Sequence, residues 1–205
     1  MPPAPEAMLA ALEALQRREL VVYPTDTLYA LGGDALDAAA VRRVFEAKRR
    51  PPSMAVSVAV ADMAMLQQVA RLSPLARRAA ERFLPGPLTL VLAPDAGLPD
   101  ELRGAQEGIA VRIPDHPAAL DLLAKFGPLT CTSANVHGQP GPATCPEARA
   151  RLGADVAVYL DAGPSLGQAS TILDLTGSEP RVLRDGALPQ AELEAWLATT
   201  TSTTM

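Results

Sequence analysis

The run Cys131-Thr-Ser-Ala-Asn135-Val-His-Gly138-Gln-Pro-Gly141-Pro-Ala-Thr144 marks this chain as an α/β protein with a ligand-binding loop. Residues 128–130 lead into it as a short expected strand, and the run is too long for a tight turn. Gly138 and Gly141 let the backbone approach a ligand closely. Open α/β sheets bind ligands where a strand ends in a small-residue loop. A surface turn is the alternative, because Ser, Asn, Gly and Pro also favour turns.

Hydrophobic periodicity continues the pattern of strands and helices on both sides of this run. Strands are expected at residues 20–23, 56–60, 88–92, 109–113, 156–160 and 180–184, and near the end of a third Gly/Ser loop within 161–174. Helices are expected at residues 7–18, 38–48, 61–84 (two, divided at Ser73-Pro74), 116–126, 146–152 and 189–197. This alternation predicts one layered α/β domain with a mixed sheet over residues 1–198. Residues 199–205 lack an apolar pattern, so a disordered tail is expected there.

Composition limits the class of protein. The 205 residues are 48% hydrophobic and carry a net charge of -5. This acidity argues against a surface that coats nucleic acid. The only two cysteines, Cys131 and Cys145, lack zinc-type spacing, so reduced thiols and a cytoplasmic protein are expected. No apolar run is long enough for a membrane span, and the N-terminus lacks signal-peptide features.

Lys48 is the first candidate site residue. It continues the apolar face formed by Val41, Val44 and Phe45, and Pro51 breaks the helix soon afterwards. The chain has 16 Arg but only two Lys, so a Lys on an inward face is notable. Its ammonium either reaches solvent or points into a pocket. If it lines a pocket, its removal should reduce activity more than stability.

Arg112 is the second candidate. It alternates on its strand with the apolar residues Ile109, Val111 and Ile113. An unpaired Arg is costly to bury. It is therefore an edge residue, an ion-pair partner or a binder of an anionic ligand.

The sequence lacks the Gly-x4-Gly-Lys-Ser/Thr, Gly-x-Gly-x-x-Gly and Gly-x-Ser-x-Gly motifs. The remaining inventory is a set of cations, Lys48, Arg50, Arg112 and Arg184, with hydroxyl groups and loop amides. Such groups suit the binding of a polyanion and the stabilisation of its developing charge. A nucleoside triphosphate with Mg²⁺ fits this chemistry.

Taken together, these stretches resemble the YrdC-like family of threonylcarbamoyl-AMP synthases over roughly residues 7–190. No single motif is specific, but their order is. The matching motifs are Tyr23-Pro-Thr-Asp-Thr-Leu-Tyr-Ala-Leu-Gly32, Lys48-Arg-Arg-Pro51, Pro85-Gly-Pro-Leu-Thr-Leu-Val-Leu92, Ile109-Ala-Val-Arg-Ile-Pro-Asp-His116, Thr132-Ser-Ala-Asn135, Ser170-Thr-Ile-Leu-Asp174 and Arg184-Asp-Gly186.

The resemblance implies a twisted, mixed open sheet flanked by helices, with a large basic cavity. It implies synthesis of threonylcarbamoyl-AMP from L-threonine, bicarbonate or CO₂ and ATP with Mg²⁺, releasing pyrophosphate for the tRNA t⁶A modification. Threonine would contact Thr27, Arg112, Cys131 and Ser170. ATP would contact Arg50, Met54, Gly108, Ser133, Gly141 and Arg184. Lys48 and Arg50 would act on the phosphates, and Asn135 would support the loop without a protein-bound metal.

The chain departs from the family pattern at the amino-acid site. Ala59 stands where many relatives carry a His that would contact threonine, and Ala55 replaces a Pro. Cys131-Thr132 stands where Ala-Pro is common. Two alternatives therefore remain: a relative that uses another amine or acyl acceptor, and a translation-associated module that binds RNA or tRNA. A tRNA-modifying transferase would be the downstream partner of the synthase.

Overall fold

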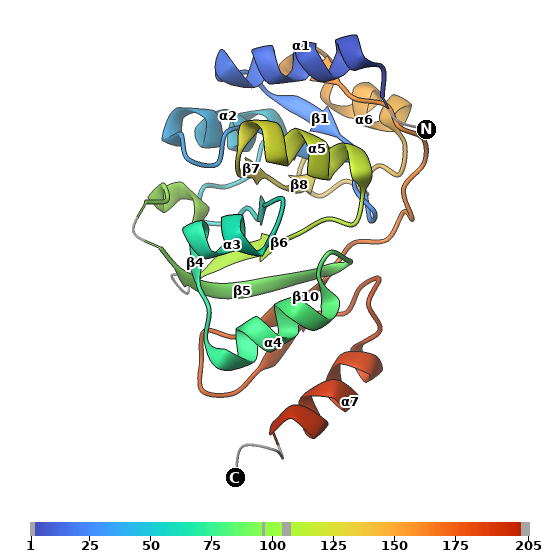
Figure 1. Ribbon diagram of the computed structural model, residues 1–205. Coiled ribbons are helices and arrows are strands. Elements are labelled where there is room, and N and C mark those ends of the chain that lie inside the picture. Colours follow the sequence, from blue (N-terminus) through green and yellow to red (C-terminus); the bar gives the residue numbers. More distant parts are fainter. Residues whose placement is uncertain (1–2, 96, 104–107, 202–205) are drawn as a thin grey trace.

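The computed structural model describes residues 3–95, 97–103 and 108–201, and within them strands and helices alternate as expected (Figure 1). The helices are α1 (Pro5–Gln16), α2 (Ala38–Lys48), α3 (Met63–Val69), α4 (Pro74–Phe83), α5 (Pro117–Phe126), α6 (Cys145–Leu152) and α7 (Gln190–Thr201). Two 3₁₀ turns, Asp100–Leu102 and Gly153–Asp155, complete the described helical segments.

The strands of the described residues form two sheets rather than the single sheet expected. The smaller sheet has the order β8-β2-β1-β9. Its strands are β8 (Thr132–Ser133), β2 (Ala30–Gly32), β1 (Val21–Tyr23) and β9 (Val158–Tyr159). β1 is antiparallel to β2 and parallel to β9, so this sheet is mixed.

The larger sheet has the order β11-β10-β5-β6-β3-β7, and β4 pairs with the end of β5. β5 is parallel to β10 and antiparallel to β6, so this sheet is mixed as well. Its strands are β11 (Arg181–Arg184), β10 (Thr171–Asp174), β5 (Leu88–Pro94), β6 (Ile109–Arg112), β3 (Val58–Ala59), β7 (Leu129–Thr130) and β4 (Ala70–Arg71).

Helices cover the sheets and close two apolar clusters. In Figure 1, α1 lies at the end of the molecule that carries β1, and α4 and α7 lie at the other end. Met8, Leu15 and Leu122 from α1 and α5 pack with Tyr23 in the smaller cluster. The larger cluster contains most of the buried residues of both sheets, with α2, α3, α4 and α6.

The helix starts follow their capping residues. The Asp37 carboxylate precedes α2 and accepts hydrogen bonds from the backbone N–H groups of Ala39 and Ala40. α2 ends at Arg49, which has the left-handed φ of 50°. The Arg50 N–H bonds back to the carbonyl of Phe45, which closes the last turn before Pro51.

Three expectations need correction. No strand was expected between residues 23 and 56, but Ala30–Gly32 forms β2, because three buried residues pair with β1 despite showing no periodicity. The strand at 128–130 continues beyond Cys131 as β8, in the other sheet. α7 extends to Thr201, so the expected tail does not begin at residue 199. The remainder of that tail, residues 202–205, lies outside the described residues.

Candidate active site

The candidate site lies where the chain passes from one sheet to the other at Cys131. Thr130 ends β7 in the larger sheet, and Thr132 begins β8 in the smaller one. The Cys131 N–H donates to the Ser57 carbonyl oxygen, and the Ser57 hydroxyl donates to the Cys131 carbonyl oxygen, each at 2.6 Å. These paired bonds hold the crossing against β3 and fix the junction of the sheets.

A cavity of about 530 Å³ opens at this junction. Most of the residues expected to bind ATP or threonine line it. They are Thr27, Arg50, Met54, Arg112, Cys131, Ser133, Ser170 and Arg184. They come from loops and strands far apart in the sequence, so the fold brings together stretches that the sequence separates. The pocket is also large enough for a small ligand of several groups.

Four other predicted residues lie behind the cavity wall rather than on it. A β-carbon on Gly141 would lie 2.6 Å from Leu28 Cδ1, and one on Gly108 would lie 2.8 Å from Val91 Cγ1. Leu28 and Val91 both line the cavity. These glycines therefore allow close packing of the wall, and any ligand contact they make would come through the backbone. Lys48 and Asn135 are the other two.

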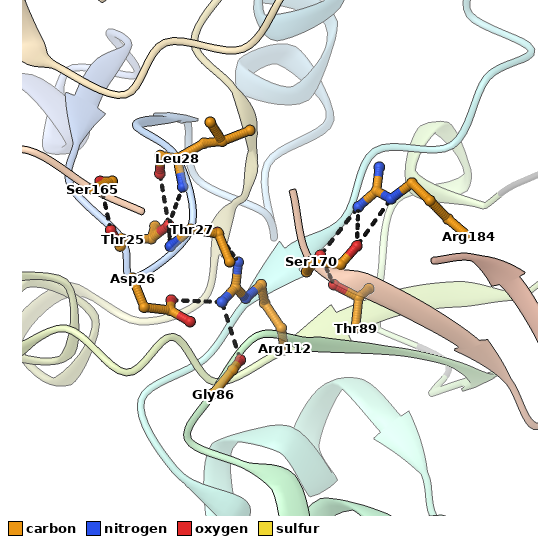
Figure 2. Close-up of polar contacts among 10 residues, drawn as sticks. All are labelled: Thr25, Asp26, Thr27, Leu28, Gly86, Thr89, Arg112, Ser165, Ser170 and Arg184. Carbon is orange, nitrogen blue, oxygen red and sulfur yellow. Dashed lines mark hydrogen bonds and ion pairs between the residues drawn. The ribbon is translucent and has the colours of Figure 1, made fainter. Parts of the chain in front are cut away.

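Arg112 is buried, with an exposed fraction of 4%. Its Nη2 donates to Asp26 Oδ1 at 2.6 Å and to the Gly86 carbonyl oxygen at 3.1 Å, and its Nη1 donates to Thr27 Oγ1 at 2.6 Å (Figure 2). The expectation of an anionic partner is met within the chain by Asp26. Arg112 Nε and Asp26 Oδ2 are buried without a hydrogen-bond partner. The pair therefore retains one donor and one acceptor for further bonding.

Arg184 forms a second polar cluster, with Ser170 and Thr89 (Figure 2). Its Nε and Nη2 donate to the Ser170 carbonyl oxygen at 2.9 and 2.7 Å, and Nη2 also lies 3.1 Å from Ser170 Oγ. Burial lowers the pKa of Arg184, and the positive charge of Arg112 lowers it further. Two cations thus repel each other across the cavity, and a bound anion would relieve that repulsion.

Arg50 adds a third cation to the lining. Its Nη2 donates to the Ala55 carbonyl oxygen at 2.8 Å, and its Nε is buried without a partner. Burial lowers the pKa of its guanidinium, yet arginine stays charged at neutral pH. Three guanidinium groups therefore line the cavity, and only that of Arg112 is paired with a carboxylate, which favours an anionic ligand.

Lys48 points inward, as predicted, and its exposed fraction is 1%. Its Nζ donates to the Asn135 carbonyl oxygen at 2.9 Å and to the Ser133 carbonyl oxygen. Burial lowers its pKa to about 7, and the charge of Arg50 acts in the same direction. Lys48 therefore anchors the loop that contains Ser133 and Asn135. The expectation that its loss would spare stability is revised, because its removal would leave two carbonyl groups unbonded.

Asn135 supports the loop, as expected. Its Nδ2 donates to the carbonyl oxygens of Val136 and Gln139 at 2.8 and 2.9 Å. The backbone N–H of His137 also donates to the Lys48 carbonyl oxygen at 2.7 Å. The Gly/Pro-rich run is thus tied to the end of α2, and it is an ordered wall rather than a free surface turn.

Several polar residues of the lining were not predicted as site residues, among them Thr25, Ser57 and Thr89. In the sequence, Thr25 resembles an ordinary turn residue and Thr89 an ordinary strand residue. In the structure both are almost fully buried. Ala59, which replaces the expected His, is buried beside Arg112 in the strand pairing and does not line the cavity. The described residues contain no group of three or more His, Cys, Asp or Glu that could hold a metal ion.

Comparison with known proteins shows the family of the chain. A family model named Sua5/YciO/YrdC, described as telomere recombination, matches residues 13–186. A putative threonylcarbamoyl-AMP synthase of Mycobacterium tuberculosis (strain H37Rv) is 44% identical over 181 residues, which are 87% of this chain and 83% of that protein. The threonylcarbamoyl-AMP synthase of Bacillus subtilis (strain 168) is 38% identical over 194 residues, 92% of this chain and 55% of that protein.

Solved structures give the same answer for the fold. Pyrococcus abyssi Sua5 complexed with L-threonine superimposes with a TM-score of 0.88 at 36% identity, covering 93% of this chain and 56% of that one. Escherichia coli YciO superimposes with a TM-score of 0.82 at 28% identity, covering 91% of this chain and 93% of that one. The chain thus spans little more than half the length of the Bacillus and Pyrococcus proteins. None of the described helices is long and apolar enough to cross a membrane.

Proposed function

The chain belongs to the Sua5/YciO/YrdC family, and we propose that it is a threonylcarbamoyl-AMP synthase. The reaction would join L-threonine, bicarbonate or CO₂, and ATP, and release pyrophosphate. One observation carries the proposal: three arginines and several hydroxyl groups converge on one cavity at the junction of the sheets. A cavity of this charge suits a ligand with a triphosphate and a carboxylate.

The proposed chemistry has two steps. The amine of threonine attacks CO₂, forms a C–N bond and loses a proton, which gives a carbamate. A carbamate oxygen then attacks the α-phosphorus of ATP, and the bond to pyrophosphate breaks. Both steps join reactants held side by side, so proximity supplies much of the rate enhancement.

The nucleotide would contact Arg50, Arg184 and Ser133, which all line the cavity. Arg50 Nε has no hydrogen-bond partner, and the charge of Arg184 is disfavoured by burial and by the nearby charge of Arg112. Phosphate oxygens would therefore suit both residues. Met54 also lines the cavity and is 37% exposed, which would give the base an apolar surface. Mg²⁺ would arrive with ATP, held by phosphate oxygens, and would neutralise charge on the leaving pyrophosphate.

Threonine would lie near Arg112, Thr27 and Ser170. The Arg112 guanidinium already spans Asp26 and Thr27, so it is held in place before a carboxylate arrives. Such preorganisation reduces the cost of binding. The Cys131 thiol lines the cavity near this group, and burial raises its pKa, so it would act as a neutral contact.

Pyrophosphate release tests the proposal. The protein is incubated with Mg-ATP and bicarbonate, alone or with each of the 20 amino acids in turn. Release that depends on both threonine and bicarbonate is expected. Release with another amine would support the alternative of a relative with a different acceptor, which the buried Ala59 keeps open.

The product would serve tRNA modification in the cytoplasm, where ATP and tRNA are found. A transferase that carries the group to tRNA would be the downstream partner. The alternative of a module that only binds RNA predicts salt-dependent tRNA binding without pyrophosphate release. The two readouts therefore separate an enzyme from a binding protein.

A further inference from the structure

Thr89 carries a buried hydroxyl at the lining of the cavity. Thr89 lies on β5, where it pairs with Ile172 of β10. It is 2% exposed, and its Oγ1 lies 2.8 Å from Ser170 Oγ. A threonine among apolar strand residues is costly to bury unless its hydroxyl forms a hydrogen bond. The bond to Ser170 is therefore the reason this hydroxyl is tolerated.

The direction of that bond follows from counting protons. A hydroxyl donates one hydrogen and accepts two. Arg184 Nη2 can only donate, so Ser170 Oγ accepts from it at 3.1 Å. Thr89 Oγ1 has no other hydrogen-bond partner among the described residues, so donating to Ser170 satisfies its proton. Ser170 Oγ then accepts two hydrogen bonds and keeps its own proton free.

Ser170 lines the cavity, so this free proton faces the ligand space. Thr89 also lines the cavity but is more deeply buried, and in the opposite direction its proton would have no acceptor among the described residues, which is the costlier arrangement. Figure 2 shows the three side chains in a row, with Ser170 between Arg184 and Thr89.

A second pair of hydroxyl groups has the reverse polarity. Thr25 Oγ1 donates its one proton to the Leu28 carbonyl oxygen at 2.6 Å and accepts longer bonds, of 3.3 Å, from the backbone N–H groups of Thr27 and Leu28. In its contact of 3.0 Å with Thr27 Oγ1, the donor is therefore the Thr27 hydroxyl. Thr27 also accepts from Arg112 Nη1. Thr27 therefore offers only a lone pair to a ligand. The cavity has a hydroxyl acceptor at Thr27 and a hydroxyl donor at Ser170.

We propose that Thr89 is a positioning residue that presents the Ser170 proton to an anionic oxygen of the amino-acid substrate. This oxygen belongs to the carboxylate or the carbamate, whereas the amine of the same molecule suits the acceptor at Thr27. The proposal rests on the proposed synthase function. It adds that hydrogen bonds between hydroxyl groups of the lining fix which end of the amino acid binds at Ser170 and which at Thr27.

Steady-state kinetics of threonine-dependent pyrophosphate release test this. Thr89→Val removes the hydroxyl and keeps a branched strand residue. Losing the orientation of one charge-assisted bond should raise the KM for threonine about tenfold. The KM for ATP should change less than twofold. Thr89→Ser restores the hydroxyl and should recover most of the threonine affinity, and Thr89→Ala replaces Thr89→Val if the latter misfolds.

A double-mutant cycle with Ser170→Ala separates positioning from packing. If Thr89 acts through Ser170, Thr89→Val should add little to the KM defect of Ser170→Ala. An unchanged threonine KM in Thr89→Val, equal effects on threonine and ATP, or full additivity with Ser170→Ala would each overturn the inference. Absence of threonine-dependent release in the wild-type protein would instead refute the proposed function.

Discussion

Lys48→Met is the substitution whose effect the structure defines most fully. Methionine keeps an unbranched side chain of similar length in a site where Lys48 is 1% exposed. It removes the amine that bonds the carbonyl oxygens of Ser133 and Asn135. A neutral amine has two N–H donors, so it can serve both carbonyls without carrying a buried charge. The protonation state therefore decides what Lys48 contributes to stability.

The pKa of Lys48 falls from 10.5 to about 7 on folding. Between these values the unfolded chain holds more protons than the folded chain, so the contribution of Lys48 to stability rises with pH. Below pH 7 both states are protonated, and the buried charge lowers stability by a constant amount. Each pH unit inside the window is worth at most ~1.4 kcal/mol. From pH 7 to pH 9 the wild type should gain about 2 kcal/mol over Lys48→Met.

Urea unfolding of both proteins at pH 6, 7, 8 and 9 measures this difference. Lys48→Met should be least destabilised at pH 6 and most destabilised at pH 9. Lys125→Met, which removes the only other lysine from a half-exposed site, is the matched control. If the difference in unfolding free energy between wild type and Lys48→Met stays constant from pH 6 to pH 9, folding does not lower the pKa of Lys48.

Three further predictions concern Arg112, Asn135 and Arg49. Arg112→Lys loses the planar fork that reaches both Asp26 and Thr27, so the threonine KM should rise about tenfold and the ATP KM much less; equal changes would contradict the assignment. Asn135→Ala removes two bonds to loop carbonyls and should lower the Tm by ~2–6 °C together with activity; an unchanged melt would count against its structural role. Arg49→Gly relieves a φ of 50° and should stabilise the fold by ~0.5–1 kcal/mol, whereas Arg49→Ala should not.

Periodicity located most of the elements, because buried strands and amphipathic helices have repeating patterns. The inward direction of Lys48 followed from its spacing with Val44 and Phe45, and its burial confirms that prediction. The division into two sheets could not be predicted from the hydrophobic pattern. It depends on Cys131 crossing between β7 and β8, and nothing in a strand of that length shows where its pairing partner changes.

The polar partners of the site residues could not be predicted from the sequence either, because they are far apart in the chain. Asp26 read as a loop residue, and only the fold brings it to Arg112, 86 residues away in the chain. Thr89 read as part of an apolar strand, yet it bonds Ser170 across the strand pair. Long-range pairs of this kind depend on strand register, which single short strands do not specify.

Following the carbon of bicarbonate shows whether threonylcarbamoyl-AMP is made in the cavity at Cys131. The protein is incubated with L-threonine, Mg-ATP and ¹³C-bicarbonate, and the products are resolved by mass spectrometry. We expect an adenylate that contains threonine and one ¹³C atom and forms together with pyrophosphate. Hydrolysis of ATP without ¹³C in any adenylate, or formation of an adenylate that does not require threonine, would contradict it.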